Sequence, residues 1–144
     1  MVTARATDYI ASEVGHGLGG NMKVIYREVT VTAPLTTDDV LQFGYAPKGF
    51  LVLGGNIEAT DLDSSGSPAI TLNIGDSGSA ARLWSATTVG QAATAAAMTA
   101  VTGLMHEYTE DTLITGAVQT GPGTGTSGTI RIAVYGLLRD SATS

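Results

Sequence analysis

The chain has 144 residues, a length typical of one domain and sufficient for an independent hydrophobic core. Its formal net charge is −6 and its seven lysines and arginines are scattered, which argues against nucleic-acid binding because that function needs a concentrated basic surface. The sequence has no cysteine, which excludes disulfides and thiolate chemistry, and no apolar run approaches the ~18 residues of a membrane-spanning helix.

An extended N-terminal arm is predicted for residues 1–21, followed by one domain at residues 22–139 and a short tail at residues 140–144. The end of the arm, residues 15–21 (GHGLGGN), is rich in glycine, which is typical of a flexible segment. Apolar side chains recur in the arm at a spacing that also fits a short amphipathic helix: Tyr9, Ile10, Val14 and Leu18. The arm lacks the continuous apolar core of a signal peptide, so we expect synthesis and folding in the cytoplasm.

The first half of the domain predicts four strands. Residues 22–32 (MKVIYREVTVT) are rich in β-branched and aromatic side chains, and residues 39–45 (DVLQFGY) alternate apolar with polar ones. Residues 48–76 predict two further strands, joined by a turn at residues 63–68 (DSSGSP) that is dense in turn formers. The second of this pair has the period-two pattern of a half-buried strand, with apolar side chains at Ile70, Leu72 and Ile74.

Residues 77–102 differ from the rest, because alanine, threonine and serine dominate and the only tryptophan lies here. We predict a long excursion over one end of the β-domain. Within it, residues 79–85 are compatible with one or two helical turns that direct Leu83 and Trp84 inward, and residues 92–97 have helix propensity.

Three more strands are predicted at residues 104–108, 112–119 and 129–138, with a Gly-Thr loop at residues 120–128. Seven or eight strands with turn signals every eight to twelve residues predict an all-β fold, an antiparallel two-sheet β-sandwich of jelly-roll type. Only 14% of the residues are charged, against about 25% in average soluble domains, so we expect another chain to cover part of the surface.

Two motifs suggest chemistry, and each lacks a partner that the chemistry needs. GDSGS at Gly75–Ser79 is similar to the sequence around a serine protease nucleophile, which would be Ser77, but the only candidate bases are His16 and His106. The run 61–66 (DLDSSG) imitates the start of an EF-hand loop, but the twelfth position, which demands glutamate, is Leu72.

We therefore predict no enzyme activity, no catalytic residues and no cofactor. For metal binding, Asp61 and Asp63 remain weak candidates, with Asp76 as an additional one, and a solvated turn is the simpler interpretation. Carboxylates also gather at residues 107–111, without the aromatic-rich cleft of a glycosidase. Six aromatic side chains could form a sugar platform, but most of them fall within strand patterns and are interpreted as core or sheet packing: Trp84, Tyr9, Tyr26, Tyr45, Tyr108 and Tyr135.

Four segments carry a resemblance to a known family: residues 38–66 (DDVLQFGYAPKGFLVLGGNIEATDLDSSG), 71–76 (TLNIGD), 81–92 (ARLWSATTVGQA) and 103–138 (GLMHEYTEDTLITGAVQTGPGTGTSGTIRIAVYGLL). The pattern resembles the small head decoration, or cement, proteins of tailed bacteriophages, in the group with a jelly-roll fold. The distinctive pieces are the PKG-hydrophobic-GG motif, DLD, IGD and the closing loop and strand; the alanine-rich tract at residues 92–97 has no match.

The resemblance implies a structural virion protein on the exterior of an icosahedral capsid, which bridges major capsid subunits and stabilises the head. Its implied partners are the major capsid protein and further copies of itself, as a homodimer or homotrimer, without nucleic acid or membrane. We assign the capsid contact to the arm, at Arg5, Tyr9, Ile10, Val14 and Leu18. The alternative is a receptor- or carbohydrate-binding β-sandwich module of a virion fibre or spike, which would use exposed aromatic side chains and loops such as residues 61–68.

Overall fold

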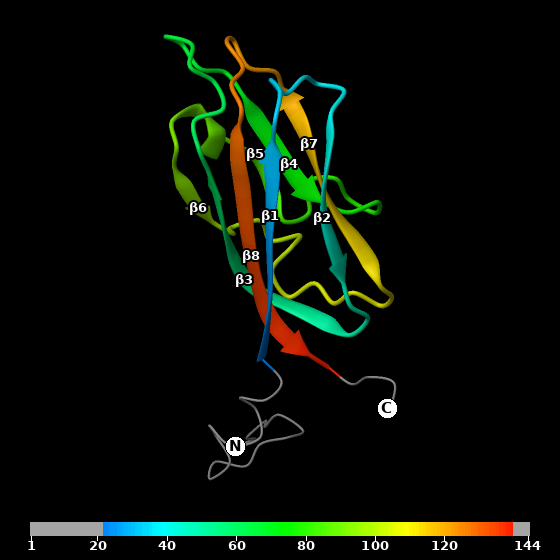
Figure 1. Ribbon diagram of the computed structural model, residues 1–144. Coiled ribbons are helices and arrows are strands. Elements are labelled where there is room, and N and C mark those ends of the chain that lie inside the picture. Colours follow the sequence, from blue (N-terminus) through cyan, green and yellow to red (C-terminus); the bar gives the residue numbers. More distant parts are fainter. Residues whose placement is uncertain (1–21, 140–144) are drawn as a thin grey trace.

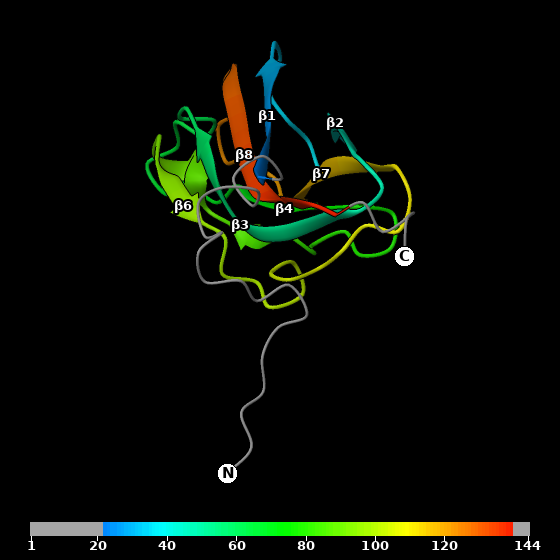
Figure 2. The ribbon, with the colours of Figure 1, turned by 90° about the horizontal axis from the view of Figure 1, so that it is seen from below.

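The computed structural model describes residues 22–139, which fold into two four-stranded antiparallel sheets packed face to face (Figures 1 and 2). The first sheet has the order β1-β8-β3-β6 and the second β2-β7-β4-β5. The strands are β1 (Met22–Val31), β2 (Val40–Ala46), β3 (Phe50–Ala59), β4 (Thr71–Gly75), β5 (Trp84–Thr87), β6 (Ala95–Ala97), β7 (Thr112–Thr120) and β8 (Gly128–Leu138). One 3₁₀ turn, η3 (Val89–Gln91), lies between β5 and β6.

The strand pairing is that of a jelly roll. β1 pairs with β8, β2 with β7, β3 with β6 and β4 with β5, all antiparallel, so the chain behaves as one long hairpin that has been rolled up. The remaining pairs, β3 with β8 and β4 with β7, close each sheet. The β-sandwich predicted from the turn spacing is therefore confirmed.

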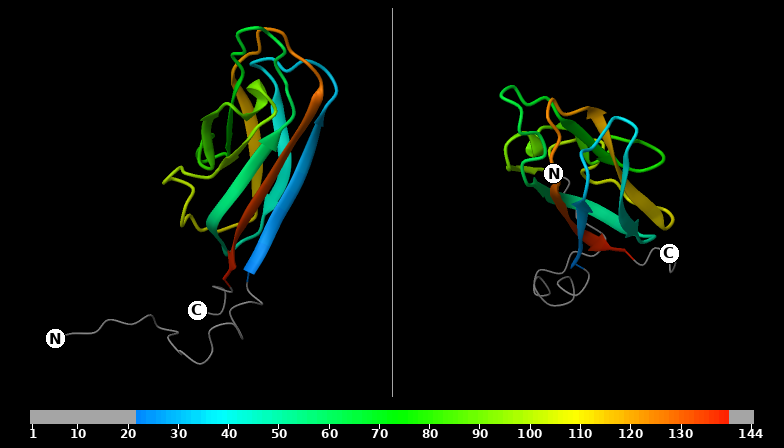
Figure 3. Two further views of the ribbon diagram at one scale, coloured as in Figure 1. Left: turned by 90° about the vertical axis from the view of Figure 1, so that its left-hand side faces the viewer. Right: turned by 45° about the horizontal axis from the view of Figure 1, so that its top comes forward.

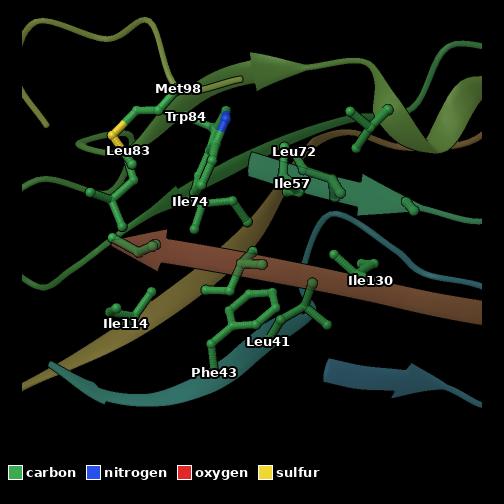
Figure 4. Close-up of a cluster of buried hydrophobic side chains, with 14 of the residues drawn as sticks. Leu41, Phe43, Ile57, Leu72, Ile74, Leu83, Trp84, Met98, Ile114 and Ile130 are labelled. Atoms are coloured by element: carbon green, nitrogen blue, oxygen red, sulfur yellow. The ribbon is translucent and has the colours of Figure 1, made fainter. Parts of the chain in front are cut away.

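The core fills the space between the two sheets (Figure 4). Alternate residues of each strand point inward, as in β8, where Ile130, Ile132 and Val134 are buried and the residues between them are not. The indole of Trp84 lies in this core with only 4% of its surface exposed. Because such interiors are packed without voids, the inward-facing set fixes the register of both sheets.

Two glycines permit close approach within the first sheet. The phenol of Tyr135 on β8 lies over Gly54 on β3, where a Cβ would touch the aromatic ring. Further along the same pair, a Cβ on Gly136 would overlap the backbone carbonyl of Leu51. β3 is also irregular between Val52 and Gly54, where its register against β8 shifts by one residue. Gly136 is required by space, since its neighbour is backbone, whereas the neighbour of Gly54 is a partly exposed side chain that can move.

The loops separate into two groups at opposite ends of the sandwich (Figures 1 and 3). One end carries the connections at residues 32–39, 60–70 and 121–127. The described chain enters at Met22 and leaves at Arg139, and both lie at the other end, since Met22 pairs with Leu137. We call this second end the terminal end.

The alanine-rich excursion differs most from the sequence expectations. No helical turn forms at residues 79–85; a turn leads into β5 instead, although Leu83 and Trp84 are buried as expected. Residues 95–97 form strand β6, because β3 supplies a partner edge that outweighs the helix propensity of alanine. Residues 104–108 hold a turn and a single bridge, Leu51 with Glu107, where a full strand was predicted.

Candidate interaction surfaces

Asp63 is the centre of a hydrogen-bonded junction between two loops. Its carboxylate accepts backbone N–H bonds at 2.7–3.2 Å from five residues: Ser65, Ala69, Ile70, Gly123 and Thr124. The side chain is only 1% exposed. Burial opposes ionisation, but the N–H donors, chiefly those of Thr124, Ala69 and Gly123, outweigh it and hold the pKa of Asp63 far below its usual range. Asp63 thereby ties the loop at residues 60–70 to the loop at residues 121–127.

This junction explains why the EF-hand-like sequence occurs here. A calcium ion would need the carboxylate oxygens of Asp63, but these oxygens accept backbone N–H groups. Asp61 in turn accepts the backbone N–H of Asp63 at 3.0 Å. Among residues 22–139, no group of three or more metal-ligating side chains is found. We therefore interpret the DLDSSG run as a loop-capping motif.

A second buried carboxylate, Asp76, organises the end of β4. It binds Arg82 through Nε at 2.6 Å and Nη2 at 3.2 Å, and it accepts the hydroxyl of Tyr108 at 3.1 Å. Burial raises the pKa of Asp76, but the hydrogen bonds from Arg82, Ser79 and Tyr108 lower it by more, so the net pKa shift is downward. His106 lies on the other side of Arg82, with Nδ1 at 3.3 Å from Nη1.

The serine-protease interpretation of GDSGS does not fit this arrangement. Ser77, Asp76 and His106 line one surface depression, but Asp76 is occupied by Arg82, and the near neighbour of the imidazole is a guanidinium instead of a carboxylate. Within the described part of the chain, no hydrogen bond joins Ser77 to His106. The nucleophile–base–carboxylate relay that acyl transfer requires is therefore not assembled.

We expect the Asp76 cluster to make the fold acid-sensitive. The pKa of His106 is lowered from 6.5, first by burial and then by the charge of Arg82, so stabilisation from the neutral imidazole is lost as the pH falls below about 6.5. Because the pKa of Asp76 lies below its ordinary 3.8, its contribution is lost only below that value. We expect the thermal midpoint, measured by circular dichroism from pH 8 to pH 3, to fall in two stages.

His106→Gln should remove the first stage of the fall in the thermal midpoint. Asp76→Asn should reduce the second stage only in part, because Asp63 contributes to the same stage. Asp38→Asn, at an exposed carboxylate in the turn before β2, is the control and should leave both stages in place. A midpoint that stays constant down to pH 3 would contradict this role of the cluster.

Several large apolar side chains share the outward face of the first sheet. Met22, Val24 and Tyr26 alternate along β1, and Tyr135 lies directly opposite Val24 on β8. Their exposed fractions are 44%, 64%, 52% and 39%, respectively. We call these four residues the tyrosine face. A contiguous exposed apolar surface of this kind marks a binding site more often than isolated apolar residues do.

The tyrosine face was not anticipated, because Tyr26 and Tyr135 were expected to pack within the protein and both are exposed. Tyr45 on β2 is also exposed, at 61%, and among the tyrosines of residues 22–139 only Tyr108 is buried. The signal was present in β1, where apolar residues occupy the outward positions of Val24 and Tyr26 as well as the inward positions of Ile25 and Val31. A strand that is apolar on both sides indicates cover on both faces.

Two further exposed apolar side chains lie in the loop after β6. Val101 is 86% exposed and Met105 66%. The loop is held against the start of β3, since Met105 donates its N–H to Val52 at 2.7 Å and Tyr108 donates to Phe50 at 2.9 Å. Phe50 pairs with Leu138, so this loop approaches the terminal end. The predicted contact residues Arg5, Tyr9, Ile10, Val14 and Leu18 lie outside the described residues.

The comparison with solved structures gives one full-length relative. A chain of the cyanophage Pam1 capsid asymmetric unit is 39% identical, with a TM-score of 0.83, and the match covers 96% of this chain and 100% of the Pam1 chain. The chain belongs to the family of this Pam1 capsid protein. It is therefore a phage structural protein.

Two other capsid structures share the fold. A chain from the capsid of Ralstonia phage GP4 is 24% identical with a TM-score of 0.76, and the match covers 85% of this chain and 87% of that one. A chain from the capsid of Helicobacter pylori bacteriophage KHP30 is 9% identical with a TM-score of 0.50, over 79% and 86%. No protein-family model and no curated protein matches the chain. Residues 22–139 contain no helix long and apolar enough to cross a membrane.

Proposed function

We propose that this protein binds the outside of an icosahedral capsid shell, bridges neighbouring major capsid subunits and stabilises the head. The observation that carries the proposal is the full-length similarity to a chain of the Pam1 capsid. The chemistry of the domain agrees with a binding role, since both buried carboxylates, Asp63 and Asp76, are used to hold loops. On the shell the protein acts as a homodimer or homotrimer.

The terminal end is the side that we assign to the shell. Residues 1–21 join the domain there at Met22, and the loop with Val101 and Met105 lies close by. An arm of 21 residues spans at most about 70 Å when extended, roughly twice the length of β1, so it can reach a neighbouring subunit. Many weak contacts of this kind give a high overall affinity, because one bound contact raises the effective concentration of the protein at the next contact site.

Shell binding can be tested with purified parent particles stripped of this protein. The full chain should rebind, and a chain that begins at Met22 should lose occupancy by about tenfold or more, since the arm supplies much of the linked contact. Both proteins should melt at the same temperature, because the deleted residues precede β1. A Tyr45→Ala variant, at an exposed tyrosine of the second sheet, serves as the matched control.

Unchanged occupancy of the truncated chain would remove the arm from the proposal. A cryo-EM reconstruction of the parent particle that shows this chain in the tail or neck, or inside the shell, would overturn the proposal itself. Solution mass tests self-association, because a stable monomer of 14.6 kDa would contradict a homodimer or homotrimer that forms before shell binding.

The receptor-binding alternative loses two of its expected elements. Trp84 is buried, so it offers no platform for a sugar ring. The loop at residues 61–68 is engaged with its neighbour through Asp63.

A further inference from the structure

A groove of about 210 Å³ lies on the outer side of the first sheet, where β1, β8, β3 and β6 run side by side (Figure 1). Its cross-strand row is Tyr26 on β1, Ala133 on β8 and Asn56 on β3. The hollow exists because Ala133 and Ala95 are small and stand between larger neighbours. Its volume is below the roughly 300–1,000 Å³ of deep ligand pockets, so it suits a single ring.

One wall of the groove is aromatic. Tyr26 is 52% exposed, so its ring is open to solvent. Tyr135 lies on the next row of the sheet, with the hydroxyl end of its ring over Gly54. Aromatic faces of this kind bind the apolar C–H face of a sugar ring, and tyrosine adds a hydroxyl at the rim.

The opposite wall offers exposed polar groups. The side chain of Asn56 is exposed, and no hydrogen bond within residues 22–139 uses its amide. Glu58 and Arg131 form an ion pair on the next row, with side-chain exposures of 51% and 43%. An amide, a carboxylate and a guanidinium held on adjacent strands supply both donors and acceptors, as neighbouring sugar hydroxyls require.

The charge of the groove limits the ligand. Glu28 and Glu58 stand on either side of Arg131 in register, so this row carries one net negative charge. A phosphate, sulfate or acidic sugar would be repelled, whereas an uncharged ring would not.

We propose that this groove binds one uncharged pyranose ring of a polysaccharide. Tyr26 stacks against the ring, Asn56 holds one hydroxyl, and the Glu58–Arg131 pair holds a neighbouring pair of hydroxyls. The site lies on the flank of the sandwich, away from the terminal end that we assign to the shell. It is a property of the isolated chain and stands or falls separately from shell binding.

The test uses the full chain, labelled and coupled to a tetrameric carrier, on an array of neutral and acidic bacterial polysaccharides. We expect binding to neutral polysaccharides, with a loss of about tenfold for Tyr26→Ala and for Asn56→Ala, which corresponds to one lost stacking or hydrogen-bonding contact. Tyr45→Ala, an equally exposed tyrosine on the second sheet, should bind as the wild type does. Each variant changes an exposed side chain, so all should keep the wild-type thermal midpoint.

Absence of binding to every polysaccharide overturns the proposal, as does binding that Tyr26→Ala leaves unchanged. Preference for acidic polysaccharides overturns it too, because the net negative charge of the row formed by Glu28, Arg131 and Glu58 would then not exclude acidic ligands. If Tyr26→Ala and Asn56→Ala alter the solution mass while no glycan binds, the groove is a protein contact and the sugar assignment is wrong.

Discussion

Replacing Asp63 with alanine is expected to lower the thermal midpoint by about 10 °C or more, because five buried or half-buried N–H groups lose their acceptor at once. The loops at residues 60–70 and 121–127 would separate at the end of the sandwich opposite the terminal end. Hydrogen exchange of the Gly123 and Thr124 amides, followed by NMR or mass spectrometry, should rise from protected to nearly unprotected.

Asp61→Ala is the matched control for this change. Asp61 lies in the same loop but is exposed and accepts a single N–H, that of Asp63. We expect its midpoint to fall by only about 2 °C. Equal effects of the two substitutions would contradict the junction. So would a midpoint that rises with added calcium and loses this rise in Asp63→Ala, since the carboxylate would then be a metal ligand.

The second large effect is expected from Gly136→Ala in β8. A methyl group there would overlap the Leu51 carbonyl, and a backbone atom cannot rotate away as a side chain does. We expect a loss of about 3 kcal/mol in the free energy of unfolding, the upper end of the usual range for overpacking, measured by urea denaturation. The β3–β8 pairing near the irregularity at Val52 would shift to accommodate the methyl group.

Gly66→Ala gives the comparison, because a methyl group at Gly66 meets no atom within 4 Å. Its free energy of unfolding should stay within about 0.5 kcal/mol of the wild-type value. If Gly136→Ala unfolds at the wild-type urea concentration, β3 and β8 are not packed as closely as described.

The strands could be predicted where their patterns were local. β1, β2, β7 and β8 begin and end within about two residues of the expected bounds, since alternation and turn residues are local signals. β6 could not be predicted, because Ala95, Ala96 and Ala97 form a strand only through the distant edge of β3. The same reason hid the turn around residues 104–108, which is shaped by contacts with Phe50 and Val52.

The candidate surfaces were harder to predict than the fold. The acidic motifs at Asp63 and Asp76 stand out in the sequence, but part of what holds each carboxylate is distant: Thr124 donates to Asp63 and Tyr108 donates to Asp76 only in the folded chain. The groove beside Tyr26 depends on which residues are neighbours across three strands. Such cross-strand rows follow from register, and register is decided by the whole core.

The shared position of Met22 and Arg139 has a mechanical consequence. β1 and β8 are adjacent antiparallel strands whose outer ends lie together, so tension between these two residues would open their ladder one rung at a time, as a zipper opens. Many hydrogen bonds of the β1–β8 ladder share a load only when the load is applied between one terminus and the loops at the opposite end of the sandwich. At the proposed position on a pressurised shell, a pull between Met22 and Arg139 would therefore separate β1 from β8 at a lower force than a load applied between the terminal end and the opposite loops.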